Sequence, residues 1–116
     1  MLKKENRLTK NKEFDNVFKK GRSGYSRVLG VKVISNGLPA DRFGILVGIK
    51  VSPKAVVRNK IKRQIRAIIG DELFLLKGGA DCAIVVFPLI LAKNYEEIAA
   101  ELRVCFRKAG LYKQLK

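Results

Sequence analysis

Bulky and small residues alternate in two segments of the chain, and this alternation predicts two β-strands. The strands are expected at residues 28–34 and 42–50, joined by a turn that contains Asn36-Gly37 and Pro39. The odd-numbered positions are bulky and apolar (Leu29, Val31, Val33, Phe43, Ile45, Val47 and Ile49), whereas the even-numbered ones include Gly30, Lys32, Gly44, Gly48 and Lys50. Successive side chains of a strand point to opposite faces. One sheet face should therefore pack against a core, and the other should be shallow and positively charged.

The glycines of the shallow face have two interpretations. Glycine weakens the interior of a strand, and one reason for its presence is the close approach of a ligand or of another backbone. The alternative is an ordinary solvated sheet face. The sequence leaves both open.

Other apolar patterns predict a central strand and three helices. Residues 82–87 are apolar on both faces, which is typical of a strand in the middle of a sheet. Helices are expected at 11–20 with Asn11 as N-cap and Gly21 after the last turn, at 53–69 with Ser52 as N-cap and Pro53 next, and from Asn94 onward. The core-facing stripes of the last two helices are Val57, Ile61, Ile65 and Ile68, and Ile98, Leu102, Cys105, Phe106 and Ala109. The length of 116 residues favours one domain (1–116), with a flexible basic arm at 1–10 and a frayed end at 113–116.

The distribution of charge points to a polyanionic partner. The chain has 25 Lys and Arg against 10 Asp and Glu, a net charge of +15. Residues 50–66 hold seven of the basic residues and no acidic one. Like charges four residues apart destabilise a helix, and no carboxylate is interleaved to relieve them. Such clustering indicates a nucleic-acid surface more than a solvated helix face, on which the signs are usually mixed.

Several other function classes find no support in the residues. The chain has no histidine, its acids are scattered, and no nucleophile or phosphate-loop motif is present, which argues against a self-sufficient nuclease. The longest apolar stretch, 83–92, is too short to span a membrane and contains Pro88. Cys82 and Cys105 are expected to be small apolar residues of a reducing compartment, and with no apolar segment behind the N-terminal basic residues the chain is expected to be cytoplasmic.

The segment AVVRNKIKRQIR, residues 55–66, resembles the signature helix of the bacterial ribonuclease P protein family. Arg58, Asn59, Lys62, Arg63 and Arg66 match that pattern, and Lys60 stands where the family usually has arginine. The resemblance extends to RLTKNKEFDNVFKKG near the start, to FGILVGIKV before the helix and to FRKAGLY near the end. The chain departs from the family at Ile49, where a paired lysine is common, and at Pro88, where an arginine often stands.

The resemblance implies a fold and a set of contacts. The fold is a small α+β domain of order α-β-β-β-α-β-α, with a left-handed βαβ crossover and helices packed on one face of a mixed four-stranded sheet. Its fourth strand is not evident from the sequence. The residues expected to bind the catalytic RNA are Lys50, Lys54, Arg58, Asn59, Lys60, Lys62, Arg63 and Arg66. Those expected to line a cleft for the single-stranded 5′ leader of precursor tRNA are Phe14, Phe18 and Lys32, although phenylalanines at helical spacing are more often core residues.

The same resemblance implies which part of the reaction belongs to the RNA and which to the protein. The partners would be the catalytic RNA subunit and precursor tRNA, with no membrane and no protein partner implied, and Mg²⁺ would be held mainly by the RNA. The protein would contribute no catalytic residue and no metal ligand, and would be inactive alone. The main alternative is a ribosomal or general RNA-binding protein of similar architecture. A DNA-binding module is less favoured, because the basic helix lacks the partner helix of a helix-turn-helix.

Overall fold

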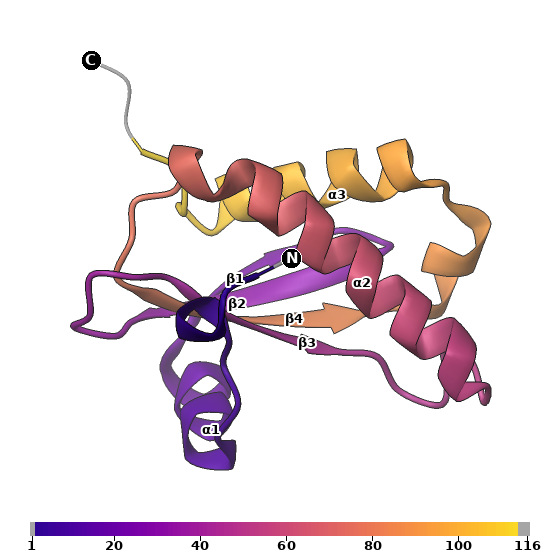
Figure 1. Ribbon diagram of the computed structural model, residues 1–116, viewed down its shortest axis with the longest axis horizontal. Coiled ribbons are helices and arrows are strands. Elements are labelled where there is room, and N and C mark those ends of the chain that lie inside the picture. Colours follow the sequence, from indigo (N-terminus) through magenta and orange to yellow (C-terminus); the bar gives the residue numbers. More distant parts are fainter. Residues whose placement is uncertain (1, 114–116) are drawn as a thin grey trace.

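The computed structural model describes residues 2–113 and has the predicted order of elements (Figure 1). The helices are α1 (Asn11–Lys20), α2 (Ala55–Glu72) and α3 (Tyr95–Lys108). The strands are β1 (Arg22–Tyr25), β2 (Leu29–Ser35), β3 (Arg42–Leu46) and β4 (Ala80–Val86). Three short 3-10 helices are η1 (Lys4–Asn6), η2 (Leu73–Leu75) and η3 (Pro88–Ala92). None of the described helices is long and apolar enough to cross a membrane.

The four strands form one mixed sheet in the order β1-β2-β4-β3. β1 pairs antiparallel with β2, β2 pairs antiparallel with β4, and β4 pairs parallel with β3. The apolar run near residue 82 is therefore a central strand, as predicted. The fourth strand, β1, has only four residues, Arg-Ser-Gly-Tyr, without an apolar alternation, and this explains why the sequence did not reveal it.

Helices α2 and α3 cover the first face of the sheet (Figure 1), and the main core lies beneath them. The predicted stripes of both helices are buried there, apart from Val57, which is half-buried. Phe106 of α3 lies at the centre, with its ring 5.9 Å from that of Phe43 and 6.2 Å from that of Tyr112. Cys82 and Cys105 are free and buried in this core, which confirms them as small apolar residues. Burial raises the pKa of both thiols.

The second face of the sheet carries α1, and here the expectation of helices on one face was wrong. Val17 of α1 packs with Leu8 and Ala83 in a small separate cluster, to which Phe14, Phe18 and Ile34 add partly buried side chains. α1 contacts β2 and β4, on the side away from α2 (Figure 1). The small residues of this face leave room for a short helix to approach the sheet, and this is the physical reason for the two-sided arrangement.

Two predicted element boundaries were also wrong at the junction between β3 and α2. The strand expected to reach residue 50 ends at Leu46, because Gly48 begins a turn in which its carbonyl accepts from Val51 N at 3.1 Å. α2 begins at Ala55 after Lys54, so Ser52 and Pro53 precede the helix. The hydroxyl of Ser52 accepts a hydrogen bond from Lys54 N at 3.2 Å, which makes a local turn rather than a helix cap.

The ends of α1 also differ from the expectation. The N-cap residue is Lys10, not Asn11, and the Glu13 carboxylate accepts from Lys10 N at 3.2 Å. Gly21 follows the helix with an extended backbone, φ −74°, so it is not a left-handed cap. A side chain at Gly21 would instead lie 2.4 Å from the Val17 carbonyl oxygen, and glycine allows this close approach.

The N-terminal segment packs against the domain from Leu2 to Leu8, where a flexible arm was expected. Leu2 and Leu8 are buried, and Leu8 N donates to Phe43 O at 2.9 Å. The amide of Asn6 donates to Asp41 O at 2.8 Å. At the other end, Lys113 N donates to Leu75 O at 2.9 Å. The expectations for residue 1 and for 114–116 concern positions outside the described residues.

Candidate nucleic-acid interface

The basic residues of α2 face away from the core because the apolar stripe fixes the rotation of the helix. Ile61, Ile65 and Ile68 are turned toward the sheet and are at most 5% exposed. Four of the predicted residues on or next to α2 are exposed: Lys54, Asn59, Lys60 and Arg63. Three are half-buried: Arg58, Lys62 and Arg66. Lys50 is exposed in the loop before the helix. The structure thus brings the eight residues together on and just before one helix, as its 3.6-residue period requires.

None of these eight residues forms an ion pair within the described part of the chain. The ion pairs there join Arg42 to Glu13 and Asp81, and Arg103 to Glu72. Glu72 also accepts from the Tyr112 hydroxyl at 2.7 Å, and this bond, with burial as the larger cause, raises the pKa of Tyr112. Because these acids are engaged elsewhere, the field of α2 is not neutralised locally. An unneutralised helix of this density favours an external polyanion.

Two arginines at the border of this face have defined positions. Arg58 donates from a guanidinium nitrogen to Ser52 O at 2.9 Å, which ties the helix to the loop before it. Arg7 donates from Nε and from a terminal nitrogen to Leu2 O at 3.2 and 3.0 Å. Together with Arg63, Arg66 and Ala67 it lines a hollow of about 340 Å³. The guanidinium N–H groups that these bonds leave free are held in a defined direction and can donate to phosphate oxygens.

Arg7 is a candidate binding residue that sequence reasoning missed. The N-terminal segment was interpreted as a free arm, whereas a backbone bridge pairs Arg7 with Phe43 of β3. The signal available in the sequence was the pair Leu2 and Leu8, apolar residues on either side of a basic run. The two departures from the family pattern carry no positive charge here: Ile49 is 74% exposed, and Pro88 is exposed at the start of η3.

The three residues predicted for the leader cleft lie together on the second face. The aromatic ring of Phe14 sits over Gly44, so close that a Cβ on Gly44 would be 2.1 Å from Phe14 Cζ. Lys32 Nζ donates to Phe18 O at 3.2 Å and thereby joins β2 to α1. Phe14, Phe18 and Lys32 are all half-buried. At Gly44 the close approach is therefore made by a ring of the chain itself.

The sheet continues beyond Phe14 and Phe18 as an open strip that sequence reasoning did not identify. Across the strands, Gly30 pairs with Val85, and Val85 pairs with Leu46, on the same face of the sheet. The ring of Tyr25 covers Gly30, where a Cβ would be 2.2 Å from Tyr25 Cδ1. Tyr25 is 47% and Leu46 38% exposed. We call Tyr25, Lys32, Leu46 and Val85 the open strip. An exposed aromatic ring, apolar floor and lysine form a surface on which a nucleobase and its phosphate can lie.

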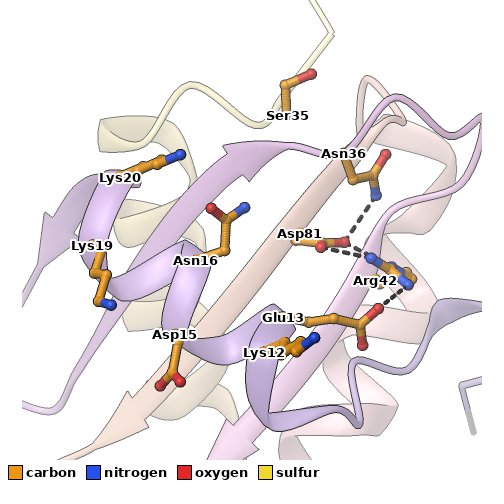
Figure 2. Close-up of a pocket in the computed structure, with 10 residues that line it drawn as sticks. All are labelled: Lys12, Glu13, Asp15, Asn16, Lys19, Lys20, Ser35, Asn36, Arg42 and Asp81. Atoms are coloured by element: carbon orange, nitrogen blue, oxygen red, sulfur yellow. Dashed lines mark hydrogen bonds and ion pairs between the residues drawn. The ribbon is translucent and has the colours of Figure 1, made fainter.

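A shallow, open polar pocket of about 710 Å³ lies on the other flank of α1 (Figure 2). Its lining residues are Lys12, Glu13, Asp15, Asn16, Lys19, Lys20, Ser35, Asn36, Arg42 and Asp81. None of the predicted leader residues belongs to this set. Helical spacing explains the separation, because Val17 faces the sheet and the phenylalanines and the polar residues project on either side of it.

Metal ligands do not gather within residues 2–113. That part of the chain contains no group of three or more His, Cys, Asp or Glu side chains that could hold a metal ion. The buried acids have other partners: Asp41, for example, accepts from Ala80 N at 3.0 Å and from Gly78 N at 3.1 Å. Burial raises the pKa of Asp41, and these two hydrogen bonds oppose the shift. The donor set of the described residues does not fit a resident Mg²⁺.

The chain is similar to known proteins over nearly its whole length. The family model described as Ribonuclease P matches residues 2–110. A ribonuclease P protein component from Synechocystis sp. is 40% identical over 112 residues, which cover 95% of this chain and 90% of the relative. One from Clostridium acetobutylicum is 40% identical over 114 residues, covering 93% and 92%.

Solved structures of such proteins have the same fold. A Staphylococcus aureus RNase P protein mutant with defective mRNA degradation activity superposes with a TM-score of 0.88 at 28% identity, covering 94% of this chain and 92% of that one. The RNase P protein from Thermotoga maritima in complex with 1-(4-fluorophenyl)-2-thiourea gives a TM-score of 0.78 at 28% identity, with 84% and 94% covered. The basic helix, the sheet and the near full-length matches lead to one conclusion: the chain belongs to the ribonuclease P family, as a protein component of this ribonucleoprotein endoribonuclease.

Proposed function

We propose that the chain binds the catalytic RNA of ribonuclease P through α2 and holds the 5′ leader of precursor tRNA on the second face of its sheet. In this role it assists the endonucleolytic removal of the leader. The observation that carries the proposal is the basic face of α2, whose residues match the family signature and have no acidic partner among the described residues.

The RNA-binding part of the proposal follows from electrostatics. Each Lys or Arg that neutralises a phosphate releases a condensed counterion, so a cluster of such residues supplies affinity that depends steeply on salt. The exposed residues Lys54, Lys60 and Arg63 and the half-buried Arg66 supply charge, and Arg58, held by Ser52 O, supplies an oriented donor. Arg7 extends this surface beyond α2.

The leader-binding part follows from the shape of the second face. A single strand of RNA needs a shallow floor for its backbone, aromatic planes for its bases and cations for its phosphates. Phe14 and Phe18 border the open strip, Tyr25 supplies an exposed ring, and Lys32 supplies the charge. The strip ends at Leu46, from which residues 47–54 lead to the basic N-terminus of α2 (Figure 1). A leader on the strip would therefore continue toward the RNA held by α2.

The chemistry of phosphodiester hydrolysis is assigned to the RNA. Mg²⁺ supplies Lewis-acid stabilisation and an activated water in reactions of this type, and in this proposal RNA phosphates and bases hold it. The protein contributes by orienting the precursor and by lowering the repulsion between two polyanions. Both effects increase the fraction of precursor bound in a productive geometry.

Reconstitution tests the proposal directly. The chain is mixed with a bacterial ribonuclease P RNA and a precursor tRNA at low Mg²⁺, and each component is omitted in turn. The expected result is cleavage at the mature 5′ end that needs the RNA and is stimulated by the protein. Cleavage by the protein alone would contradict the assignment of catalysis, and a lack of stimulation would favour the alternative of a general RNA-binding protein.

Phe14→Ala tests the leader site. If a base stacks on this ring, the affinity for leader-bearing precursor should fall by about 1–3 kcal/mol while that for leaderless tRNA stays nearly constant. Equal losses for the two substrates, measured with the same reconstituted enzyme, would indicate a core role for Phe14 instead.

A further inference from the structure

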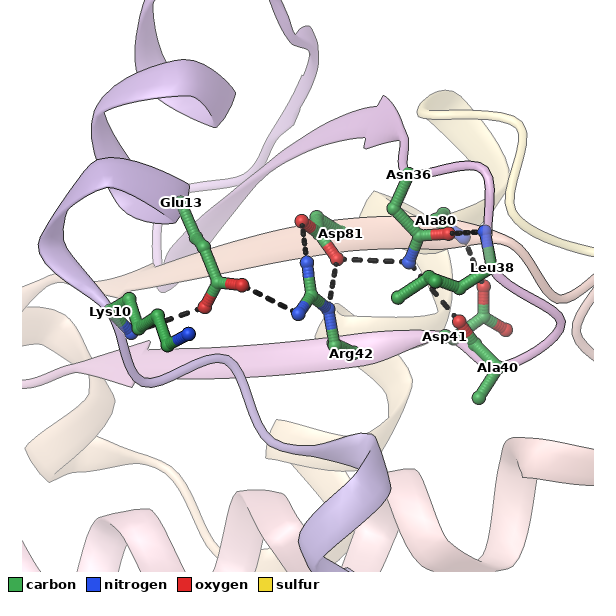
Figure 3. Close-up of polar contacts among 9 residues, drawn as sticks. All are labelled: Lys10, Glu13, Asn36, Leu38, Ala40, Asp41, Arg42, Ala80 and Asp81. Carbon is green, nitrogen blue, oxygen red and sulfur yellow. Dashed lines mark hydrogen bonds and ion pairs between the residues drawn. The ribbon is translucent and has the colours of Figure 1, made fainter.

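An ion-paired network ties the first turn of α1 to the sheet (Figure 3). The guanidinium of Arg42, at the start of β3, binds both carboxylate oxygens of Asp81, from Nε and from a terminal nitrogen, each at 2.7 Å. Its remaining terminal nitrogen binds Glu13 of α1 at 2.5 Å. Asn36 donates to Asp81 at 2.9 Å and to Ala40 O at 3.1 Å, which fixes the carboxylate from the other side.

The network is sheltered enough to hold its geometry. The side chains of Arg42, Glu13 and Asp81 are 22%, 19% and 7% exposed. A paired hydrogen bond between a guanidinium and a carboxylate fixes direction as well as distance. The hydrogen bond to Asp81, the largest cause, raises the pKa of Arg42, so its charge is maintained. We call the Glu13–Arg42–Asp81 set the clasp.

The rest of the attachment of α1 is slight. The helix has ten residues, a length that is marginal for an isolated helix, and of these only Val17 is fully buried. Lys32 holds the C-terminal half through Phe18 O. At the N-terminal half, Glu13 and Phe14 are neighbours in the chain, and Arg42 and Gly44 are on the same face of β3. The ion pair and the ring thus contact the sheet side by side.

We infer that Arg42 and Glu13 are positioning residues for the leader: they do not touch it, and they set where α1 places Phe14 beside the open strip. The inference rests on the proposed function, because it concerns the geometry of the same leader site. Loss of the clasp lets the N-terminal half of α1 move over the sheet. The Phe14 ring would then no longer lie where a base of the leader can stack on it, and the contribution of that stacking to leader affinity would be lost in part.

Glu13→Gln isolates the clasp from the fold of α1. The amide oxygen of glutamine keeps an acceptor for Lys10 N, whereas the charge that pairs with Arg42 is lost. The matched control is Asp15→Asn, which makes the same change of charge at an exposed position of the same helix and forms no ion pair in the described residues. The control also reports any general gain in RNA affinity from the added positive charge.

The experiment uses the enzyme reconstituted with a bacterial ribonuclease P RNA and measures the affinity for leader-bearing precursor relative to leaderless tRNA. We expect Glu13→Gln to lower this ratio about fivefold or more, because fivefold is the low end of the loss expected when one base no longer stacks on its ring, and Asp15→Asn to leave it unchanged. The cleavage rate at saturating enzyme should remain close to that of the wild type, because chemistry belongs to the RNA. Arg42→Lys, which keeps the charge and loses the fork, should recover part of the ratio that Arg42→Ala loses.

Combination with Phe14→Ala separates positioning from a structural role. If the clasp acts through Phe14, adding Glu13→Gln to Phe14→Ala should lower the ratio no further. An equal additional loss in that background, or equal ratios for Glu13→Gln and Asp15→Asn, would overturn the inference. If the wild-type enzyme bound leader-bearing precursor and leaderless tRNA equally well, both the proposed leader site and the positioning role of the clasp would be refuted. If the affinity ratio depended on Phe14 and not on Glu13, only the positioning role of the clasp would be refuted.

Discussion

A methyl group added at Gly44 should push the Phe14 ring off the sheet. The new Cβ would be 2.1 and 2.3 Å from two ring carbons of Phe14, whereas ordinary contacts begin at 3.4 Å, so the ring must move until its nearest carbon is 3.4 Å rather than 2.1 Å away. It would also be 3.3 Å from Leu8 O, a tight contact that needs only a small adjustment. Over-packing of this kind costs about 1–3 kcal/mol, and we expect Gly44→Ala to lower the free energy of unfolding by that amount.

Urea unfolding of a double-mutant cycle measures how much of this cost belongs to the ring. The variants are Gly44→Ala, Phe14→Ala and the combination, with Gly48→Ala as control because a Cβ there meets no atom within 4 Å. In the Phe14→Ala background the added methyl group should cost little beyond the contact with Leu8 O. We therefore expect a coupling of about 1 kcal/mol or more between positions 14 and 44.

Two results would refute this reasoning. One is a cost of Gly44→Ala that is the same with and without the Phe14 ring, which would mean that the methyl group clashes with something else. The other is equal stability of Gly44→Ala and Gly48→Ala, which would mean that the ring does not lie over Gly44. The reconstituted enzyme carrying Gly44→Ala should also lose part of its leader discrimination, since Phe14 is displaced.

Three further outcomes are expected. Cys82 and Cys105 should react with a thiol reagent at pH 8 much more slowly in the folded protein than in urea, because burial raises their pKa values and leaves less thiolate; similar rates in the two states would contradict their placement in the core. Asp41→Asn should lower the free energy of unfolding by about 1–3 kcal/mol, because Gly78 N and Ala80 N donate to different carboxylate oxygens and the amide NH2 that replaces one of them cannot accept, and an unchanged urea midpoint would count against these contacts. Arg7→Ala should weaken binding to the catalytic RNA and lower its salt dependence by roughly one phosphate contact, while Lys4→Ala on the exposed side of η1 serves as control; equal effects of the two would remove Arg7 from the interface.

Sequence patterns revealed those elements in which the regularly spaced apolar residues are also the residues buried in the core, or in which neighbouring residues cap the helix. The stripe on α2 and the cap of α3 are examples: Asn94 accepts from Glu97 N at 2.9 Å and Glu97 accepts from Asn94 N at 3.0 Å, a local arrangement encoded by residues three apart. The eight basic residues were assigned to one helix face by the same logic. The apolar stripe on the same helix faces the core, and this fixes which of the basic residues are exposed and which are half-buried.

The features that sequence reasoning missed depend on contacts between distant residues. β1 is a strand only because it pairs with β2, and Arg7 joins the basic surface only because residues 2–8 pack against β3. The placement of α1 on the second face depends on Gly44 and Ala83, small residues whose role is visible only when Phe14 and Val17 are seen to pack there. The clasp joins residues 13, 42 and 81, which no local pattern connects.

The central claim is that the unpaired charge of α2 meets RNA phosphates, and the salt dependence of RNA binding tests it most directly. Binding of the catalytic RNA is measured over a series of salt concentrations for the wild type and for Arg58, Lys62 and Arg66 changed together to alanine. A control loses the same charge at Lys77, Arg107 and Lys113, which are exposed outside α2. With roughly 0.7–0.9 per phosphate contact, the slope of log affinity against log salt should become shallower by about 2–3 for the α2 variant. A slope that stays unchanged, or that changes equally in the control, would contradict the claim.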